Sequence, residues 1–190
     1  LAMERPELRY LNEDSLFSDK VNIYHEDAMQ FLEETEQFYD LVIIDLPDPN
    51  TEALSKLYST AFYALIYRRL SIDGMMVTQS TSPYFARKAY WCIANTVETA
   101  FEEQISGGFM YPYHVNVPSF GEWGFVMGAK RAKDWSKLEI SVPTKFLSTE
   151  RAQSLFVFGK DIDRIDVKPN FLLNPSLYLH YREGWQHFNQ

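Results

Sequence analysis

Two aspartates three residues apart, Asp45 and Asp48, are the side chains in this sequence best placed to do chemistry. They follow the apolar run Tyr39–Ile44 and stand in the segment Asp-Leu-Pro-Asp-Pro, which two prolines stiffen. A nearly continuous apolar run is typical of a strand buried on both faces. Two carboxylates at its end could bind a dication, ligate a metal, or supply a general base with an electrostatic partner. The structural alternative is that Asp45 caps a turn and Asp48 is solvated.

A third carboxylate, Asp27, follows a short run of β-forming residues, Val21–Tyr24, within the segment His-Glu-Asp-Ala that ends at Ala28. In this position it could accept the amino group of an adenine. It suits equally well the N-cap of the helix that the following residues predict. One side chain can do both, so both interpretations stay open.

Two further segments combine polar and aromatic side chains. Gln79 begins a stretch of polar residues that leads to Tyr84, which would suit an amine-binding pocket or, with Ser82 as cap, the entry to a helix. The segment Pro-Ser-Phe-Gly-Glu-Trp-Gly-Phe supplies Phe120, Glu122 and Trp123. These could wall a site for a cationic chain, or form a hairpin with core aromatics.

The elements that would position these residues alternate along the first hundred residues. We expect strands at 21–24, 39–44 and 75–78, with helices at 27–38, 51–70 and from 83 to about 101. This order predicts an α/β, Rossmann-like fold of the class I methyltransferase type, with a mostly parallel sheet. The strand over 41–44 should lie in the sheet interior, between the strands at 21 and 75. Right-handed crossovers then place the loops with the candidate residues at one edge.

The second half of the chain is less regular. Strands over 113–117 and 123–127 predict an antiparallel hairpin, and a short helix is expected within 145–158. We place a boundary near residue 136, between a Rossmann-like domain of residues 1–135 and an irregular or helical C-terminal extension of residues 136–190.

Composition narrows the classes of function. The 190 residues are 46% hydrophobic and 23% charged, which excludes wholesale disorder and fits one domain with a sizeable core. A formal net charge of −8 argues against a nucleic-acid partner and suits a cationic ligand. The single cysteine, Cys92, excludes an internal disulfide and a cysteine zinc cluster. The four histidines have no metal-ligand spacing, so we expect no metal.

The termini and apolar runs bear on location. The longest apolar stretch, Ala61–Tyr67, is far short of the roughly 20 residues that cross a bilayer, and the N-terminus lacks a signal pattern. We therefore expect a cytoplasmic chain. Because residue 1 is not Met, we also expect a fragment of a longer protein.

Taken in order, these segments resemble the polyamine aminopropyltransferases, the spermidine and spermine synthase family, over about residues 5 to 130. The Asp-Leu-Pro-Asp-Pro and Pro-Ser-Phe-Gly-Glu-Trp-Gly-Phe segments carry most of the resemblance. It is strongest to the long bacterial members, in which membrane-spanning segments precede the enzyme domain. The chain would then be the C-terminal catalytic part of such a protein, with a parent that can be membrane-anchored.

The resemblance implies transfer of an aminopropyl group from decarboxylated S-adenosylmethionine, a co-substrate, to a diamine such as putrescine, giving spermidine. No cofactor is implied, and we expect a homo-oligomer. Asp48 matches the acid that deprotonates the amine. Phe120 stands where the shorter members have a Tyr, and it has no hydroxyl to make that residue's contact. Nucleotide contacts are expected from Asp27, Ala28 and Asp45, and amine contacts from Asp45, Gln79, Tyr84, Phe120, Glu122 and Trp123.

The family's Gly-rich nucleotide loop has no counterpart in this sequence and would precede residue 1, so we expect the fragment to be inactive alone. Two alternatives stay open. One is a class I S-adenosylmethionine-dependent methyltransferase, which shares the fold type. The other is a non-catalytic polyamine-binding domain.

Overall fold

The structure is a computed structural model that describes residues 2–186. Its four strands form one mixed sheet in the order β1-β2-β4-β3. β1 and β2 pair in parallel, whereas β2 with β4 and β3 with β4 pair antiparallel, so the α/β class and the hairpin are confirmed while the sheet is mixed rather than mostly parallel. The strand bounds are β1 Tyr39–Ile44, β2 Leu70–Gln79, β3 Phe109–Val117 and β4 Gly121–Ala129.

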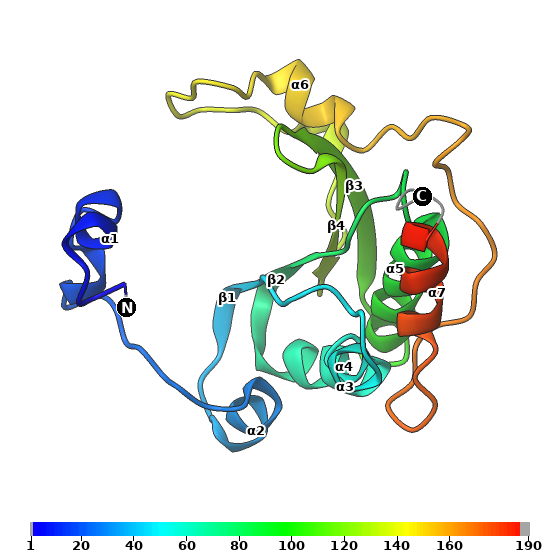
Figure 1. The fold of residues 1–190 in the computed structure, drawn as a ribbon, viewed down its shortest axis with the longest axis horizontal. Helices are drawn as coiled ribbons and strands as arrows, with labels where there is room; N and C mark the ends of the chain where they lie inside the picture. Colours follow the sequence, from blue (N-terminus) through cyan, green and yellow to red (C-terminus); the bar gives the residue numbers. More distant parts are fainter. Residues whose placement is uncertain (1, 187–190) are drawn as a thin grey trace.

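Seven α-helices and two 3-10 turns, at Ser15–Phe17 and Trp135–Lys137, complete the described residues. Figure 1 shows α5 and α7 side by side on one side of the sheet, and α1 apart from the other elements at the end of an extended stretch. The helix bounds are α1 Pro6–Leu11, α2 Ala28–Glu34, α3 Glu52–Lys56, α4 Thr60–Arg69, α5 Arg87–Glu102, α6 Thr149–Ser154 and α7 Leu177–Gln186.

The one helix predicted over 51–70 is two helices. Thr51 caps α3 through a hydrogen bond from the Leu54 amide, and Ser59 caps α4 through one from the Phe62 amide. Side-chain oxygens of Ser and Thr satisfy the first free amides of a helix, so a second capping residue starts a second helix. The apolar spacing continued through this break and hid it.

The core lies between the sheet and α5, whose side chains are mostly buried. Two glycines of β4 allow the helix to approach closely. A Cβ on Gly124 would stand 2.3 Å from Cε2 of Tyr90, and one on Gly128 would stand 2.6 Å from Cζ of Phe101. Because side chains alternate along a strand, Gly124, Val126 and Gly128 face α5, and Trp123 and Phe125 face the opposite side.

The strand over 41–44, which is part of β1, was predicted to lie in the interior of the sheet, and this prediction is wrong. β1 lies at the edge of the sheet, with Leu41 57% and Ile43 70% exposed, and no strand forms at residues 21–24. Among residues 2–186, β2 is therefore the one strand that pairs with β1. An apolar run indicates that both faces of a strand suit burial, but it does not say which segment covers them.

The C-terminal segment packs against the sheet domain through Asn170, whose side chain is fully buried. Its Nδ2 donates to the carbonyls of Ser55 at 2.7 Å and Tyr58 at 3.1 Å. Its Oδ1 accepts from the amides of Ser176 and Leu177, at the start of α7. The sequence pattern predicted only an irregular or helical tail here. The boundary near residue 136 stays a prediction.

Within residues 2–186, no helix combines the length and the apolar character needed to span a membrane.

We expect Gly124→Ala to destabilise the fold, because its new methyl group would overlap the buried ring of Tyr90. Overpacking of this kind costs about 1–3 kcal/mol of unfolding free energy, which urea titration would measure. Gly159→Ala is the matched control, since its Cβ would meet only the movable end of the Asp161 side chain. Equal stability of the two variants would contradict the packing described here.

Candidate active site

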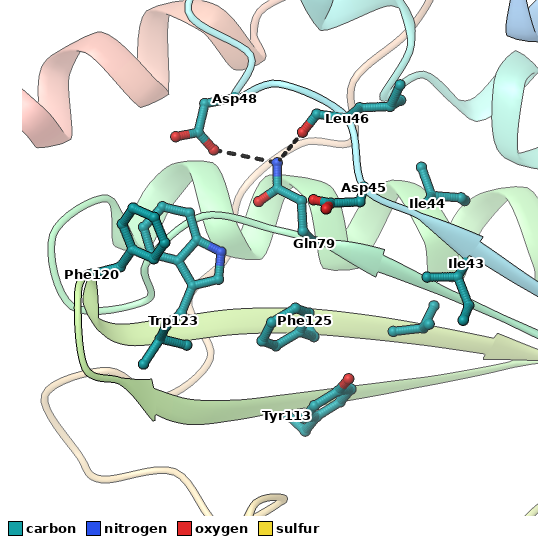
Figure 2. A pocket seen from close by; sticks show the side chains of 12 residues that line it. Ile43, Ile44, Asp45, Leu46, Asp48, Gln79, Tyr113, Phe120, Trp123 and Phe125 are labelled. Atoms are coloured by element: carbon teal, nitrogen blue, oxygen red, sulfur yellow. Dashed lines mark hydrogen bonds between the residues drawn. The ribbon is translucent and has the colours of Figure 1, made fainter. Parts of the chain in front are cut away.

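An open cavity of about 600 Å³ lies on the sheet face opposite α5, beside the carboxyl ends of β1 and β2. Figure 2 shows Asp45 and Asp48 on one wall and four aromatic rings, of Tyr113, Phe120, Trp123 and Phe125, on the facing wall. The other lining residues are Ile43, Ile44, Leu46, Val77, Gln79 and Val117. The cavity therefore combines carboxylates with aromatic faces, a combination that suits an organic cation.

Asp48 is half-buried, and both of its carboxylate oxygens accept hydrogen bonds. Gln79 Nε2 lies 3.3 Å from Oδ1, and Tyr181 Oη lies 2.9 Å from Oδ2. Burial raises the pKa of Asp48, and the bonds from Tyr181 and Gln79 act in the opposite direction. Both donors are neutral, and no ion pair involves Asp48 within the described residues. Hydrogen bonds therefore orient the Asp48 carboxylate, but within these residues no cationic side chain balances its negative charge.

The loop that carries Asp48 is fixed by Gln79 and Tyr58. Gln79 Nε2 shares its two N–H groups among three acceptors, which are the Leu46 carbonyl at 2.8 Å, Tyr58 Oη at 2.7 Å and, at the longer distance given above, Asp48 Oδ1. Its Oε1 accepts from the Thr81 amide. Tyr58 Oη in turn lies within 3.2 Å of the Leu46 and Pro47 carbonyls. Burial raises the pKa of Tyr58, so its hydroxyl keeps its proton and can donate. Both the nitrogen and the oxygen of the Gln79 amide thus form hydrogen bonds within the protein.

Asp45 is exposed and belongs to two cavities. It lines the one with Asp48 and also a second, of about 670 Å³, along the free edge of β1. In the part of the chain that the structure describes, its carboxylate forms no hydrogen bond or ion pair. Ala28 lines the second cavity as well. Ala28 and Asp45, which were both predicted to contact a nucleotide, therefore line the same cavity.

Asp27 caps α2, as the sequence suggested. Its Oδ1 accepts from the amides of Met29 at 2.9 Å and Gln30 at 3.0 Å. Asp27 is not among the residues that line the second cavity, although its neighbours Glu26 and Ala28 are. The capping half of the interpretation is confirmed, and a contact with adenine stays a prediction.

Two of the predicted amine ligands lie outside the first cavity. Tyr84 is 53% exposed, and its ring meets Phe85 edge-on at 5.2 Å. Glu122 alternates with Trp123 along β4, so its side chain points to the opposite face, where it bonds His114 Nδ1. A role for either residue in binding an amine stays a prediction. By contrast, Phe120 and Trp123 form part of the aromatic wall, with ring centroids 5.3 Å apart.

Sequence reasoning missed Tyr181 and Tyr58. Tyr181 lies in α7, within a segment interpreted as an irregular tail. The one available signal was the spacing of Tyr181 and Trp185, four residues apart, which places both on one face of a helix. Nothing local to Tyr58 distinguishes it from the other apolar residues of its helical pattern.

Within the described residues, no group of three or more His, Cys, Asp or Glu side chains could hold a metal ion.

We expect Asp48→Asn to raise the melting temperature at neutral pH, by about a few degrees at most. A carboxyl whose folded pKa is raised stabilises the fold below its unfolded pKa, and this contribution is lost as the pH rises through the folded value. The difference should therefore vanish well below about pH 4, where the Asp48 carboxyl is protonated in both the folded and the unfolded protein. The exposed Asp45→Asn should have no such effect. Thermal melts at both pH values test this, and a lower melting temperature at neutral pH would contradict it.

Comparisons with known proteins show what the chain as a whole is similar to. Curated polyamine aminopropyltransferases of Oceanobacillus iheyensis and Leptospira interrogans are each 40% identical to the chain, over 99% and 97% of its length. The chain spans only 36% of either relative, about a third of its length.

Solved structures share the fold. Spermidine synthase from Thermotoga maritima superposes with a TM-score of 0.64 at 17% identity, over 80% of this chain and 52% of that one. A spermidine synthase in complex with the transition state analogue AdoDATO gives a TM-score of 0.63 at 16% identity, with the same coverage. The model of the spermine/spermidine synthase domain matches residues 3–138. Because that match covers more than half of the chain, the chain belongs to the spermine/spermidine synthase family.

Proposed function

We propose that this chain is the catalytic part of a polyamine aminopropyltransferase, which transfers an aminopropyl group from decarboxylated S-adenosylmethionine to a diamine such as putrescine, giving spermidine. The observation that carries the proposal is Asp48, a half-buried carboxylate held by two neutral donors opposite an aromatic wall. Membership of the family supports the same reaction.

The chemistry needs such a carboxylate. A primary alkylammonium has a pKa near that of Lys, about 10.4, so at neutral pH almost none of it is nucleophilic. Asp48 accepts one proton from the ammonium, and the freed nitrogen attacks the carbon next to the sulfonium. A carbon–nitrogen bond forms, the carbon–sulfur bond breaks, and its electron pair leaves on sulfur as a neutral thioether. Asp48 acts as the general base of this step.

The remaining residues of the first cavity divide between binding and support. Trp123 and Phe120 offer ring faces to the cationic chain of the diamine, an interaction that strengthens in a site from which water is excluded. Asp45, which is exposed at the junction of the two cavities, attracts the amine or the sulfonium. We assign Gln79 to holding the Asp48 loop, because its amide already bonds Leu46, Tyr58 and Thr81.

We place the nucleotide on the side of the second cavity, near Asp27, Ala28 and Asp45. The reaction as written needs no metal and no cofactor besides the co-substrate. Both substrates are cations, which an acidic chain with a net charge of −8 attracts over long range. A cytoplasmic homo-oligomer remains our proposal for the whole protein.

In the full-length protein, Asp48→Asn should lower the turnover number about 10²- to 10⁴-fold, because it keeps the shape and removes the proton acceptor. A higher pH should partly restore turnover, since more of the amine then arrives deprotonated. Steady-state kinetics with putrescine across pH would measure both effects.

Asp27→Asn is the matched control for that experiment. Asn is as good an N-cap as Asp, so α2 should be unaffected while the charge is lost. We expect weaker binding of the nucleotide with a smaller change in turnover at saturation. Near-normal turnover of Asp48→Asn at neutral pH would show that another group takes the proton, and Asp45 would be the next candidate.

The 190-residue chain by itself should bind decarboxylated S-adenosylmethionine weakly or not at all. Close approach of backbone to the nucleotide in such folds depends on a Gly-rich loop, and this sequence contains none. Isothermal titration calorimetry tests this directly, with the full-length protein as the positive control. Micromolar binding to residues 1–190 would contradict it.

A further inference from the structure

Trp185 of α7 touches the aromatic wall of the first cavity without lining the cavity itself. Its ring centroid lies 6.4 Å from that of Trp123, and the two ring planes are inclined by 46°. Aromatic rings at such a separation are in favourable contact. Trp185 is half-buried, so part of its indole is packed inside the protein. It therefore supports the Trp123 ring from outside the cavity.

The same Trp185 indole is linked to the polar wall of the cavity. Its Nε1 donates to Thr81 Oγ1 at 3.4 Å, and the Thr81 amide donates to Gln79 Oε1 at 3.1 Å. Gln79 lines the cavity beside the carboxylates of Asp45 and Asp48, as Figure 2 shows. One side chain of α7 is thus connected to both walls, to the aromatic wall by a ring contact and to the polar wall through Thr81.

Trp185 is held in place because α7 is seated closely on the segment before α5. A Cβ on the preceding residue, Gly184, would stand 2.6 Å from Cα of Ala86, so this approach needs a glycine. The ring of Phe85 lies 5.0 Å from that of Trp185. Because close-packed side chains resist displacement, the volume of the Trp185 indole limits how far the neighbouring ring of the aromatic wall can recede.

We propose that Trp185 is a positioning residue which, through Trp123, sets the length of the acceptor diamine. This inference rests on the function proposed above, and it concerns the space for the amine, whichever carboxylate takes the proton. Diamines of different length carry the same two ammonium groups, so a carboxylate alone does not distinguish them. Their methylene chains differ, and the room along the aromatic wall can discriminate between these. Trp185 lies beyond residues 3–138, which the family domain matches.

The test uses the full-length protein and two acceptors, putrescine and cadaverine, which is one methylene longer. Trp185→Leu removes the indole and lets the Trp123 ring recede. We expect the ratio of kcat/KM for cadaverine to that for putrescine to rise about tenfold, the lower end of what one methylene is worth in an apolar pocket. Trp185→Phe keeps a ring against Trp123 and should give a smaller rise. Leu179→Ala, which shortens an exposed side chain of the same helix, should leave the ratio unchanged.

This ratio does not depend on the amount of folded enzyme, because a loss of active protein lowers both kcat/KM values equally. An unchanged ratio in Trp185→Leu and Trp185→Phe, even with both values lowered, would overturn the proposal and indicate a purely structural role. A similar rise in Leu179→Ala would also overturn it, since the effect would not belong to the Trp185 ring. If Trp185→Leu does not fold, Trp185→Phe decides alone.

The route through Trp123 has its own test. Trp185→Leu is combined with Trp123→Leu, which already opens the aromatic wall. If Trp185 acts through Trp123, its substitution should change the ratio less in this background than in the unchanged protein, because the effects of residues in contact are not additive. The same change in both backgrounds would refute the route.

Isothermal titration calorimetry separates this inference from the proposed function, because it measures the affinity for each diamine without any transfer. In Trp185→Leu, the ratio of the two dissociation constants should shift in favour of cadaverine. An unchanged ratio would refute the role of Trp185. A protein that transfers no aminopropyl group to either diamine, but whose affinities shift as expected, would refute only the proposed function.

Discussion

The site depends on one buried segment, Gln79–Ser82, which begins with the last residue of β2. Within it, Thr81 has a φ of +57°, a left-handed conformation that a β-branched residue rarely adopts. The surroundings hold it there, since its amide donates to Gln79 Oε1 and its carbonyl accepts from the Gly124 amide at 2.7 Å. Strained backbone of this kind persists only where neighbouring contacts over-determine it, and it is concentrated at functional sites.

Through this segment, parts of the chain that are far apart in the sequence meet. The Gln79 amide fixes the loop after β1, Thr81 pairs with β4 through Gly124, and Thr81 Oγ1 accepts from Trp185 of α7. Because Gly124 has no side chain, both the Tyr90 ring and the Thr81 carbonyl can lie close to its backbone. One small residue in β4 therefore sets how closely α5 and the segment Gln79–Ser82 can pack against this strand.

What the sequence could predict follows from the range of the contacts. Asp48 could be chosen as a candidate because its strand, its prolines and its neighbour Asp45 lie within ten residues. The hairpin of β3 and β4 is equally local and was correctly predicted. The hydrogen bond from Tyr181 to Asp48 was not predicted, because it joins residues 133 apart in the sequence. The edge position of β1 was missed for a related reason, since burial of Ile43 depends on a neighbouring strand that no local pattern specifies.

The choice of neutral groups around Asp48 has a physical reason. A Lys or Arg in place of Gln79 or Tyr181 would hold the carboxylate more strongly, but it would lower the pKa of Asp48 and compensate the charge that, in the function proposed above, attracts an ammonium. A hydroxyl and an amide fix its orientation and leave that charge for the substrate. The fold then carries a partly desolvated carboxylate that forms no ion pair with any cationic side chain of residues 2–186, which costs stability. Such a cost is expected where a site must receive its counter-ion from the substrate rather than from the protein.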